Sequence, residues 1–232
     1  MTVIQIDVDL PDELAAAVER GGIPASTICQ RALEQAVRRA NALRADDLRA
    51  MDEAALTARL PHYTARARAA LRLALDQAGP GGAVTSAGLL GGILAEGSNL
   101  AVRLLPALGV DPAALAADLA AAPAGEDDTP AALAAEGDAP RFSGPAVAAL
   151  ELAASEAMDL HHNYIGCEHL LLGLLHPVWP DAASRVSAQT GHAGPDGAAG
   201  RALRARGAGL PAARAAVVAA VAGLAHARAA NG

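Results

Sequence analysis

Lysine is absent from this sequence of 232 residues, and all 18 basic residues are arginine. A P-loop ATPase needs a lysine that reaches the β- and γ-phosphates, and Schiff-base catalysis needs a side-chain amine. The sequence therefore excludes Walker-type ATP hydrolysis and lysine-based covalent catalysis by these residues. Aromatic residues are also scarce, at 2% of the chain. A core without aromatics is built from alanine, leucine and valine, which favours packed helices.

Cysteine pairs, a positive net charge and long apolar runs are missing as well. The two cysteines, Cys29 and Cys167, fit no C-x-x-C pattern, so the sequence predicts neither a disulfide framework nor a zinc knuckle. The net charge of −7 excludes nucleic-acid binding through a general basic field, so any DNA contact has to be local. Because no signal-peptide pattern and no membrane-spanning stretch occur, we expect a cytoplasmic location.

Motifs for metal binding and catalysis are lacking too. No G-x-S-x-G elbow occurs, and no serine lies in a recognisable catalytic motif. H-x-x-x-H and H-E-x-x-H spacings, which place two histidines on one face of a helix, are absent among His161, His162, His169 and His176. We therefore predict no enzyme activity, no metal site and no cofactor.

Residues 2–10 alternate between apolar and polar side chains, which is the period of a half-buried strand. Two short helical patterns follow, and the second ends near Arg39. A single strand cannot satisfy its own backbone hydrogen bonds, so we expect a homodimer through residues 2–40. The pattern resembles the ribbon-helix-helix family of repressors and antitoxins, in which paired strands from two chains enter the DNA major groove.

In that family the outward strand side chains read base edges, a role that the resemblance gives to Thr2 or Val3 together with Gln5. Asp7 and Asp9 oppose DNA binding, so dimerisation alone is the alternative. We assign residues 1–44 to this module and residues 45–60 to a helical connector with balanced charge.

The body of the chain, residues 61–226, looks like two copies of one helical unit. Each copy opens with an aromatic residue and a hydroxyl residue, which suits a buried anchor followed by a helix N-cap. These pairs are Tyr63-Thr64 and Phe142-Ser143. We therefore predict a mainly α-helical body made of repeat one at 61–120, a flexible linker at 121–140, and repeat two at 141–226 with an insertion at 176–200.

A polar turn runs directly into an apolar helix between His161 and Leu175. Its core, His162-Asn163-Tyr164-Ile165-Gly166-Cys167-Glu168-His169-Leu170-Leu171-Leu172-Gly173-Leu174, resembles the repeat signature of the Clp unfoldase N-terminal domain, especially that of the ClpC type. The resemblance implies a two-repeat helical domain that receives substrates, adaptors, phosphoarginine and, in actinobacterial relatives, cyclic peptide antibiotics such as cyclomarin. It favours a stand-alone, non-catalytic domain that sequesters such ligands as a protective decoy.

The resemblance also implies site residues. Glu168 matches the glutamate of the phosphoarginine-type site, where a carboxylate accepts a guanidinium through two hydrogen bonds. The alternative is that Glu168 only complements the positive end of its helix. In repeat one the corresponding residue is Ala87. The surface that binds cyclic peptides lies between the first helices of the two repeats, and it maps here onto Leu60, Tyr63, Arg68, Leu71, Arg72, Leu75, Phe142, Val147, Leu150 and Glu151.

Phe142 has two interpretations, since a lone phenylalanine is either an aromatic hot spot for a ligand or a core residue. Two other functions stay open for the chain as a whole. One is a ribbon-helix-helix transcriptional regulator that senses a ligand through its Clp-like body. The other is an adaptor that brings clients to a Clp protease.

Overall fold

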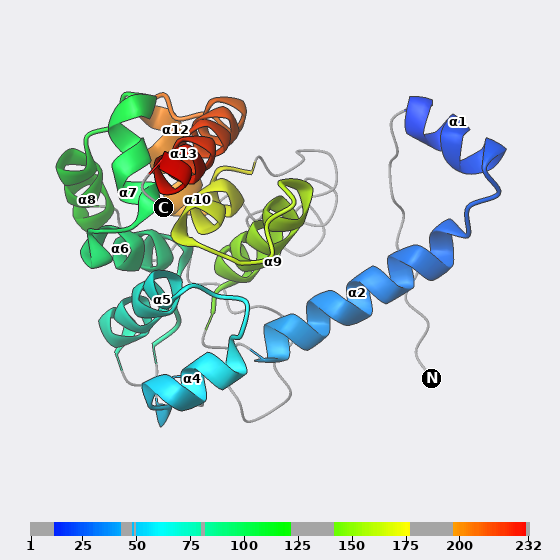
Figure 1. The fold of residues 1–232 in the computed structure, drawn as a ribbon. Coiled ribbons are helices and arrows are strands. Elements are labelled where there is room, and N and C mark those ends of the chain that lie inside the picture. The colour runs from blue at the N-terminus through cyan, green and yellow to red at the C-terminus, as the bar shows by residue number, and fades with distance from the viewer. Residues whose placement is uncertain are drawn as a thin grey trace. The chain divides into compact units, whose positions relative to one another are not determined.

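The computed structural model describes residues 12–42, 48, 50–79, 82–121, 142–176 and 197–230 (Figure 1). The strand predicted for residues 2–10, with Thr2, Val3 and Gln5, lies outside the described residues. So do most of the predicted linker and most of the predicted insertion. The chain divides into two compact units, residues 1–41 and residues 42–232.

The first unit contains α1 (Asp12–Arg20) and α2 (Ala25–Ala42). Acidic residues in the first turn of α1 and Arg20 in its last turn complement the helix dipole. Gly22, with φ of 57°, lies in the turn that separates the two helices. The helices agree with the sequence pattern, but two helices do not establish a ribbon-helix-helix module. No side chain of residues 12–34 is buried.

Repeat one begins with α5 (Ala65–Ala78) and α6 (Ser86–Glu96), followed by α7 (Leu100–Leu104), the 3-10 helix η1 (Leu105–Leu108) and α8 (Pro112–Ala121). Side-chain caps start three of these helices. Thr64, Thr85 and Asn99 each accept a hydrogen bond from a backbone N–H in the first turn that follows. A polar residue at each boundary therefore sets where these helices begin.

Repeat two has the same order of helices: α9 (Gly144–Asp159), α10 (Cys167–Leu175), α12 (Ala198–Ala205) and α13 (Leu210–Ala230). Ser143 caps α9 as Thr64 caps α5. Gly109 and Gly207, with φ of 75° and 87°, occupy the same turn in the two copies, a conformation that favours glycine. Shared caps and turns give a residue-by-residue correspondence between the repeats.

Glycine lets the first two helices of each repeat pack closely. A Cβ on Gly92 of α6 would lie 2.3 Å from the Ala70 carbonyl oxygen of α5. A Cβ on Gly173 of α10 would lie 2.1 Å from the Ala149 carbonyl oxygen of α9. Neither position has room for a larger residue, since backbone cannot move aside as a side chain can. The α5–α6 and α9–α10 pairs make the most extensive helix–helix contacts among the described residues.

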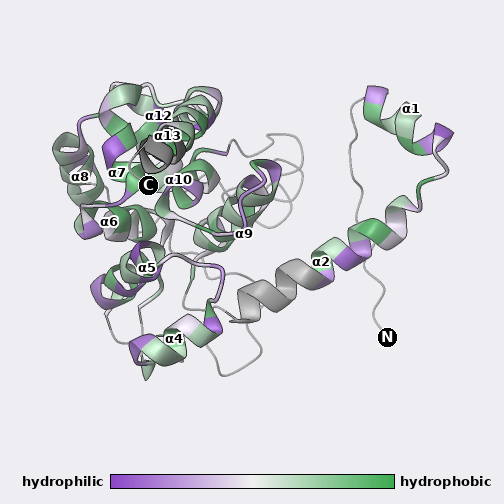
Figure 2. Cartoon of the chain, viewed as in Figure 1, coloured by the Kyte–Doolittle hydropathy of each residue, from purple (hydrophilic) through white to green (hydrophobic). Residues whose placement is uncertain are grey.

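Two isolated parallel bridges join the repeats, and they are related by the same internal symmetry. Tyr63, before α5, pairs with Ile165, before α10, while Val84, before α6, pairs with Phe142, before α9. The Thr64 N–H donates to the Ile165 carbonyl at 2.9 Å and the Ser143 N–H to the Val84 carbonyl at 2.9 Å. One leucine-rich core runs through both repeats, and hydrophobic residues predominate in α6 and α8 (Figure 2).

The described part of the connector contains α4 (Glu53–Arg59), which Asp52 caps by accepting from the Ala55 N–H at 2.7 Å. Leu48, Leu56 and Leu60 are buried in the same core as α5, so this segment packs as part of the domain. Among the described residues no single helix has the length and apolar character of a membrane span. The helical segments 100–108 and 112–121 meet the length and hydropathy of a membrane span only when they are taken together, and a bend of 97° separates them.

Candidate functional site

The residues predicted to bind cyclic peptides fall into two groups. Half of them are core residues with 4% exposure or less, namely Leu60, Leu71, Leu75, Phe142 and Leu150. These side chains offer no surface to a ligand, because the apolar stripe that marked them faces the interior. The burial of Phe142 agrees with its interpretation as the core residue that opens repeat two.

The other half, which are Tyr63, Arg68, Arg72, Val147 and Glu151, are partly exposed. Both arginines contact the connector segment that precedes α5. Arg68 Nε donates to Glu53 Oε1 at 3.2 Å, and Arg72 Nη2 donates to the Met51 carbonyl at 2.8 Å. A ligand at α5 would therefore have to displace or extend contacts that the α4 segment already makes.

Glu168, the residue predicted to bind phosphoarginine, lies in the first turn of α10 and is 5% exposed. Its carboxylate folds back over Gly166, where a Cβ would lie 2.3 Å from Oε1. Burial raises the pKa of Glu168, because desolvation disfavours the charged form. This position fits the alternative of a helix-end carboxylate, and a bound guanidinium would require Glu168 to turn outward.

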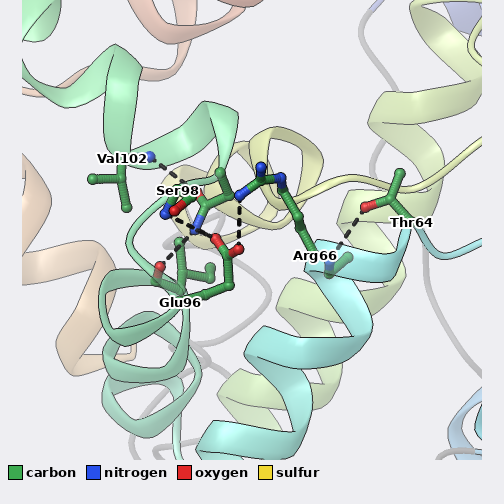
Figure 3. A network of polar contacts seen from close by, with 8 residues as sticks. Thr64, Arg66, Glu96, Ser98 and Val102 are labelled. Carbon is green, nitrogen blue, oxygen red and sulfur yellow. Dashed lines mark hydrogen bonds and ion pairs between the residues drawn. The ribbon is translucent and has the colours of Figure 1, made fainter. Parts of the chain in front are cut away.

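A polar network missed by the sequence reasoning lies where α5, α6 and α7 meet (Figure 3). Arg66 Nη1 donates to Glu96 Oε1 at 3.0 Å, and Glu96 Oε2 accepts from the Ser98 N–H and from Asn99 Nδ2. Asn99 is buried and also donates to the Ile93 carbonyl at 2.7 Å. The sequence of the turn Glu96-Gly97-Ser98-Asn99 indicates the end of a helix, but it contains no signal that predicts the ion pair with Arg66.

Cys167 faces this network from α10. Its thiol is 1% exposed, and its pKa is raised first by burial and then by the nearby carboxylates of Glu168 and Glu96. A thiol with a raised pKa is a poor nucleophile, so Cys167 is a packing residue here. The Arg66 side chain is 55% exposed and is the part of this cluster that a ligand can reach.

Three aromatic rings form a cluster at the turn that precedes α10 and at the start of that helix. His162 stacks on Tyr164, and the buried His169 meets both rings edge-on. The Gly166 N–H donates to His169 Nδ1 at 2.9 Å, which leaves the proton on Nε2 to be donated to His162 Nδ1 at 2.8 Å. Burial, and then His162, lowers the pKa of His169 to about 4.

Repeat two also contains a buried acid, Glu156 of α9, which is 1% exposed. Arg214 of α13 donates to it through Nε at 2.9 Å and through Nη2, and His176 Nε2 lies 2.6 Å from Glu156 Oε1. Burial would raise the pKa of Glu156, but the hydrogen bonds from Arg214 and His176 outweigh it and hold the pKa below its ordinary value. Among residues that the structure describes, no three histidine, cysteine or acidic side chains gather to hold a metal ion.

Repeat one has an open groove of about 620 Å³ along α6 and α8. Gly88, Gly91 and Leu94 line it from α6, while Ala116 and Leu119 line it from α8. Gln77, at the end of α5, closes one side. The sequence analysis did not predict this groove, because a run of small and apolar residues in a helix gives no local sign of a surface groove.

Comparison with known proteins agrees with this architecture. The model of the Clp repeat (R) N-terminal domain matches residues 62–179. The uncharacterized proteins Rv2667 of Mycobacterium tuberculosis (strain ATCC 25618 / H37Rv) and Mb2686 of Mycobacterium bovis are 40% identical over 116 residues, which is 49% of this chain. The chain covers only 42% of the length of these curated relatives.

The expected resemblance to the Clp N-terminal repeat is thereby confirmed for residues 62–179, and so is the mainly helical fold of that region. The match begins two residues after Leu60, so α4 and the first unit lie outside it. The repeats, their shared caps and the matched range lead to one conclusion. The chain belongs to the Clp repeat N-terminal domain family, whose role is protein interaction in the Clp system.

Proposed function

We propose that this chain is a non-catalytic peptide-binding module that engages the ligands of a ClpC-type unfoldase. Cyclic peptide antibiotics, adaptor proteins and phosphoarginine clients are the ligand classes concerned. The observation that carries the proposal is the family match over residues 62–179 together with the paired four-helix order of both repeats. A module that binds such a ligand without unfolding anything would protect the unfoldase by lowering the free ligand concentration.

The two repeats differ in what they offer to a phosphoarginine. Repeat two keeps Glu168, with the exposed guanidinium of Arg66 nearby to attract a phosphate. Repeat one has Ala87 at the position of Glu168. We therefore expect one phosphoarginine site per chain at most, and its use requires the buried carboxylate to turn toward the ligand.

Calorimetric titration of the full chain with phosphoarginine and with a cyclomarin-type cyclic peptide tests the proposal. Saturable heat with either ligand supports it, and Arg66→Gln should weaken phosphoarginine binding while leaving the cyclic peptide unaffected. Arg103→Gln is the matched control, since Arg103 is an exposed arginine in α7. No heat with either ligand would exclude sequestration as the function.

We also propose that the first unit forms a homodimer. Its two helices and the turn between them expose apolar residues that a folded unit normally covers, namely Leu14 at 48%, Ile23 at 44%, Ile28 at 52% and Leu33 at 49%. Sedimentation equilibrium should show a dimer that Leu14→Glu/Leu33→Glu converts to a monomer. A chain that is monomeric throughout the micromolar range would rule this out.

A further inference from the structure

The groove along α6 and α8 in repeat one corresponds to a space between α10 and α13 in repeat two. The two repeats differ in the size of the side chains at this space. Shared caps place Gly91 of α6 where α10 has Leu172, and Ala95 where α10 is followed by His176. Shared turns place Ala116 of α8 where α13 has Arg214. Each of these three positions has a small residue in repeat one and a large one in repeat two.

Repeat two fills the space with its own side chains. Leu172 is fully buried, and Arg214 reaches across from α13 to the end of α9, where Glu156 accepts its guanidinium. His176 completes the cluster at 2.6 Å from Glu156. This copy therefore shows what the interhelical space can hold: one aliphatic side chain beside one long side chain that ends on the acceptor of α9.

Repeat one lacks all of these groups, and the result is the groove of about 620 Å³. Its acceptor at the end of the first helix is Gln77, in the position of Glu156. Among the described residues of the lining none is charged, and Gln77 is the only one with a polar side chain. A volume of this size is typical of sites that bind a ligand of several side chains or of drug size.

We propose that the groove between α6 and α8 binds an uncharged, aliphatic peptide segment of a partner protein, whose side chains occupy the space that repeat two fills internally. The inference rests on the proposed function as a peptide-binding module, and it assigns that module a site separate from Glu168 and from the predicted cyclic-peptide surface around Arg68 and Arg72. Leu94 and Leu119 supply the apolar contact.

The chemistry of the lining decides which peptide fits. An arginine in this space would lose the ion pair that Arg214 makes with Glu156, because Gln77 has no charge. A guanidinium there would have no carboxylate partner, whereas an aliphatic side chain gains free energy from burial. The Gln77 amide can both donate to and accept from a peptide backbone, which holds an extended segment in place.

Filling the groove from within gives a direct test. Gly91→Leu/Ala116→Leu restores large residues of the kind found in repeat two. A Cβ on Gly91 meets only Gln77 Oε1 at 3.0 Å, at the flexible end of a side chain, so the fold should tolerate the change. Gly88→Leu, whose Cβ meets nothing closer than 3.4 Å, is a second blocking variant. Gly223→Leu is the matched control, because Gly223 lies in α13 with nothing within 4 Å of its Cβ.

The probes are three fluorescein-labelled decapeptides: one with leucine alternating with serine, one with serine at every leucine position, and one with arginine at those positions. Anisotropy is measured on the full chain in 0.5 M salt, which screens general attraction to a chain of net charge −7. We expect saturable binding of the leucine peptide only. Both blocking variants should weaken it at least tenfold, and Gly223→Leu should leave it unchanged. Methyl resonances of Leu94 and Leu119 should shift on binding.

Equal affinity of the leucine peptide for the native chain and for the blocked variants would overturn the groove as the site while leaving peptide binding intact. Equal or tighter binding of the arginine peptide would overturn the assigned chemistry. If the leucine peptide does not bind but phosphoarginine or the cyclic peptide gives heat, the groove is refuted and the proposed function stands. If the leucine peptide binds at the groove and those ligands give no heat, the groove stands and sequestration fails.

Discussion

Acidification should destabilise the domain between about pH 6.5 and pH 4 through His169. This side chain is fully buried, and its Nδ1 accepts the Gly166 N–H that starts α10. Protonation would place a hydrogen on Nδ1 facing that donor and would leave a charge in the core. The folded-state pKa is accordingly lowered from 6.5 to about 4. Since the unfolded chain binds the proton more tightly, stability is complete above about pH 6.5 and falls as the pH drops toward 4.

The magnitude follows from the same two pKa values. The interval from 6.5 to about 4 corresponds, at about 1.36 kcal/mol per pH unit, to a loss of about 3 kcal/mol. Other groups titrate nearby. Glu156, whose pKa is lowered, begins to weaken the fold as the pH falls through the ordinary pKa of a glutamate. Glu168, whose pKa is raised, favours the fold as the pH falls. A comparison between variants is therefore needed to isolate His169.

His169→Gln provides that comparison, because glutamine at this position of a helix can still accept the N-cap N–H but carries no titratable proton. Urea denaturation followed by circular dichroism at pH 7.5 and pH 4.5 gives the free energy of unfolding for each protein. We expect the native chain to lose roughly 2 to 3 kcal/mol more than His169→Gln between these pH values. His62→Gln, at an exposed histidine, should behave like the native chain. Equal losses in the native chain and His169→Gln would refute the reasoning.

Three further changes test the packing. Gly173→Ala should lower the free energy of unfolding by about 2 kcal/mol, because its Cβ would lie 2.1 Å from the Ala149 carbonyl oxygen. The control Gly223→Ala should be neutral or stabilising. Thermal melts distinguish the two variants, and an unchanged melting temperature for Gly173→Ala would contradict the close contact. Arg214→Met should cost about 2 kcal/mol by leaving Glu156 buried without its main donor, and adding Glu156→Gln should recover much of that loss; additive losses would contradict a coupled pair. Thr64→Ala should cost about 1 kcal/mol by removing the α5 cap, and an unchanged urea midpoint would show that the cap is dispensable.

Local features were predictable because they depend on neighbouring residues alone. Thr64 and Ser143 were identified as helix caps from an aromatic-hydroxyl pair, and both cap as expected. The Clp-type turn before Cys167 was also predictable, since few unrelated folds combine a polar turn with an unbroken apolar helix directly after it. Neither inference required knowing what the segment packs against.

Exposure was harder to predict, because an apolar stripe shows which face of a helix is buried without showing what covers it. Phe142 and Leu150 were placed on a ligand surface and lie in the core. Arg68 and Arg72 were placed on the same surface, and they bond to Glu53 and to the Met51 carbonyl in the connector. The sequence contains no local signal for a contact between segments this far apart.

The sequence by itself determined that the body is helical, that its unit occurs twice, and where the first helix of each copy begins, because caps, glycines and apolar periods act within a few residues. Only the tertiary structure decided what each copy does with the space between its helices. Arg214 reaches Glu156 from a helix 58 positions later in the chain, and the same space beside Gln77 is left open. Whether an interhelical gap is filled or vacant depends on side chains brought together by the fold, which no local pattern records.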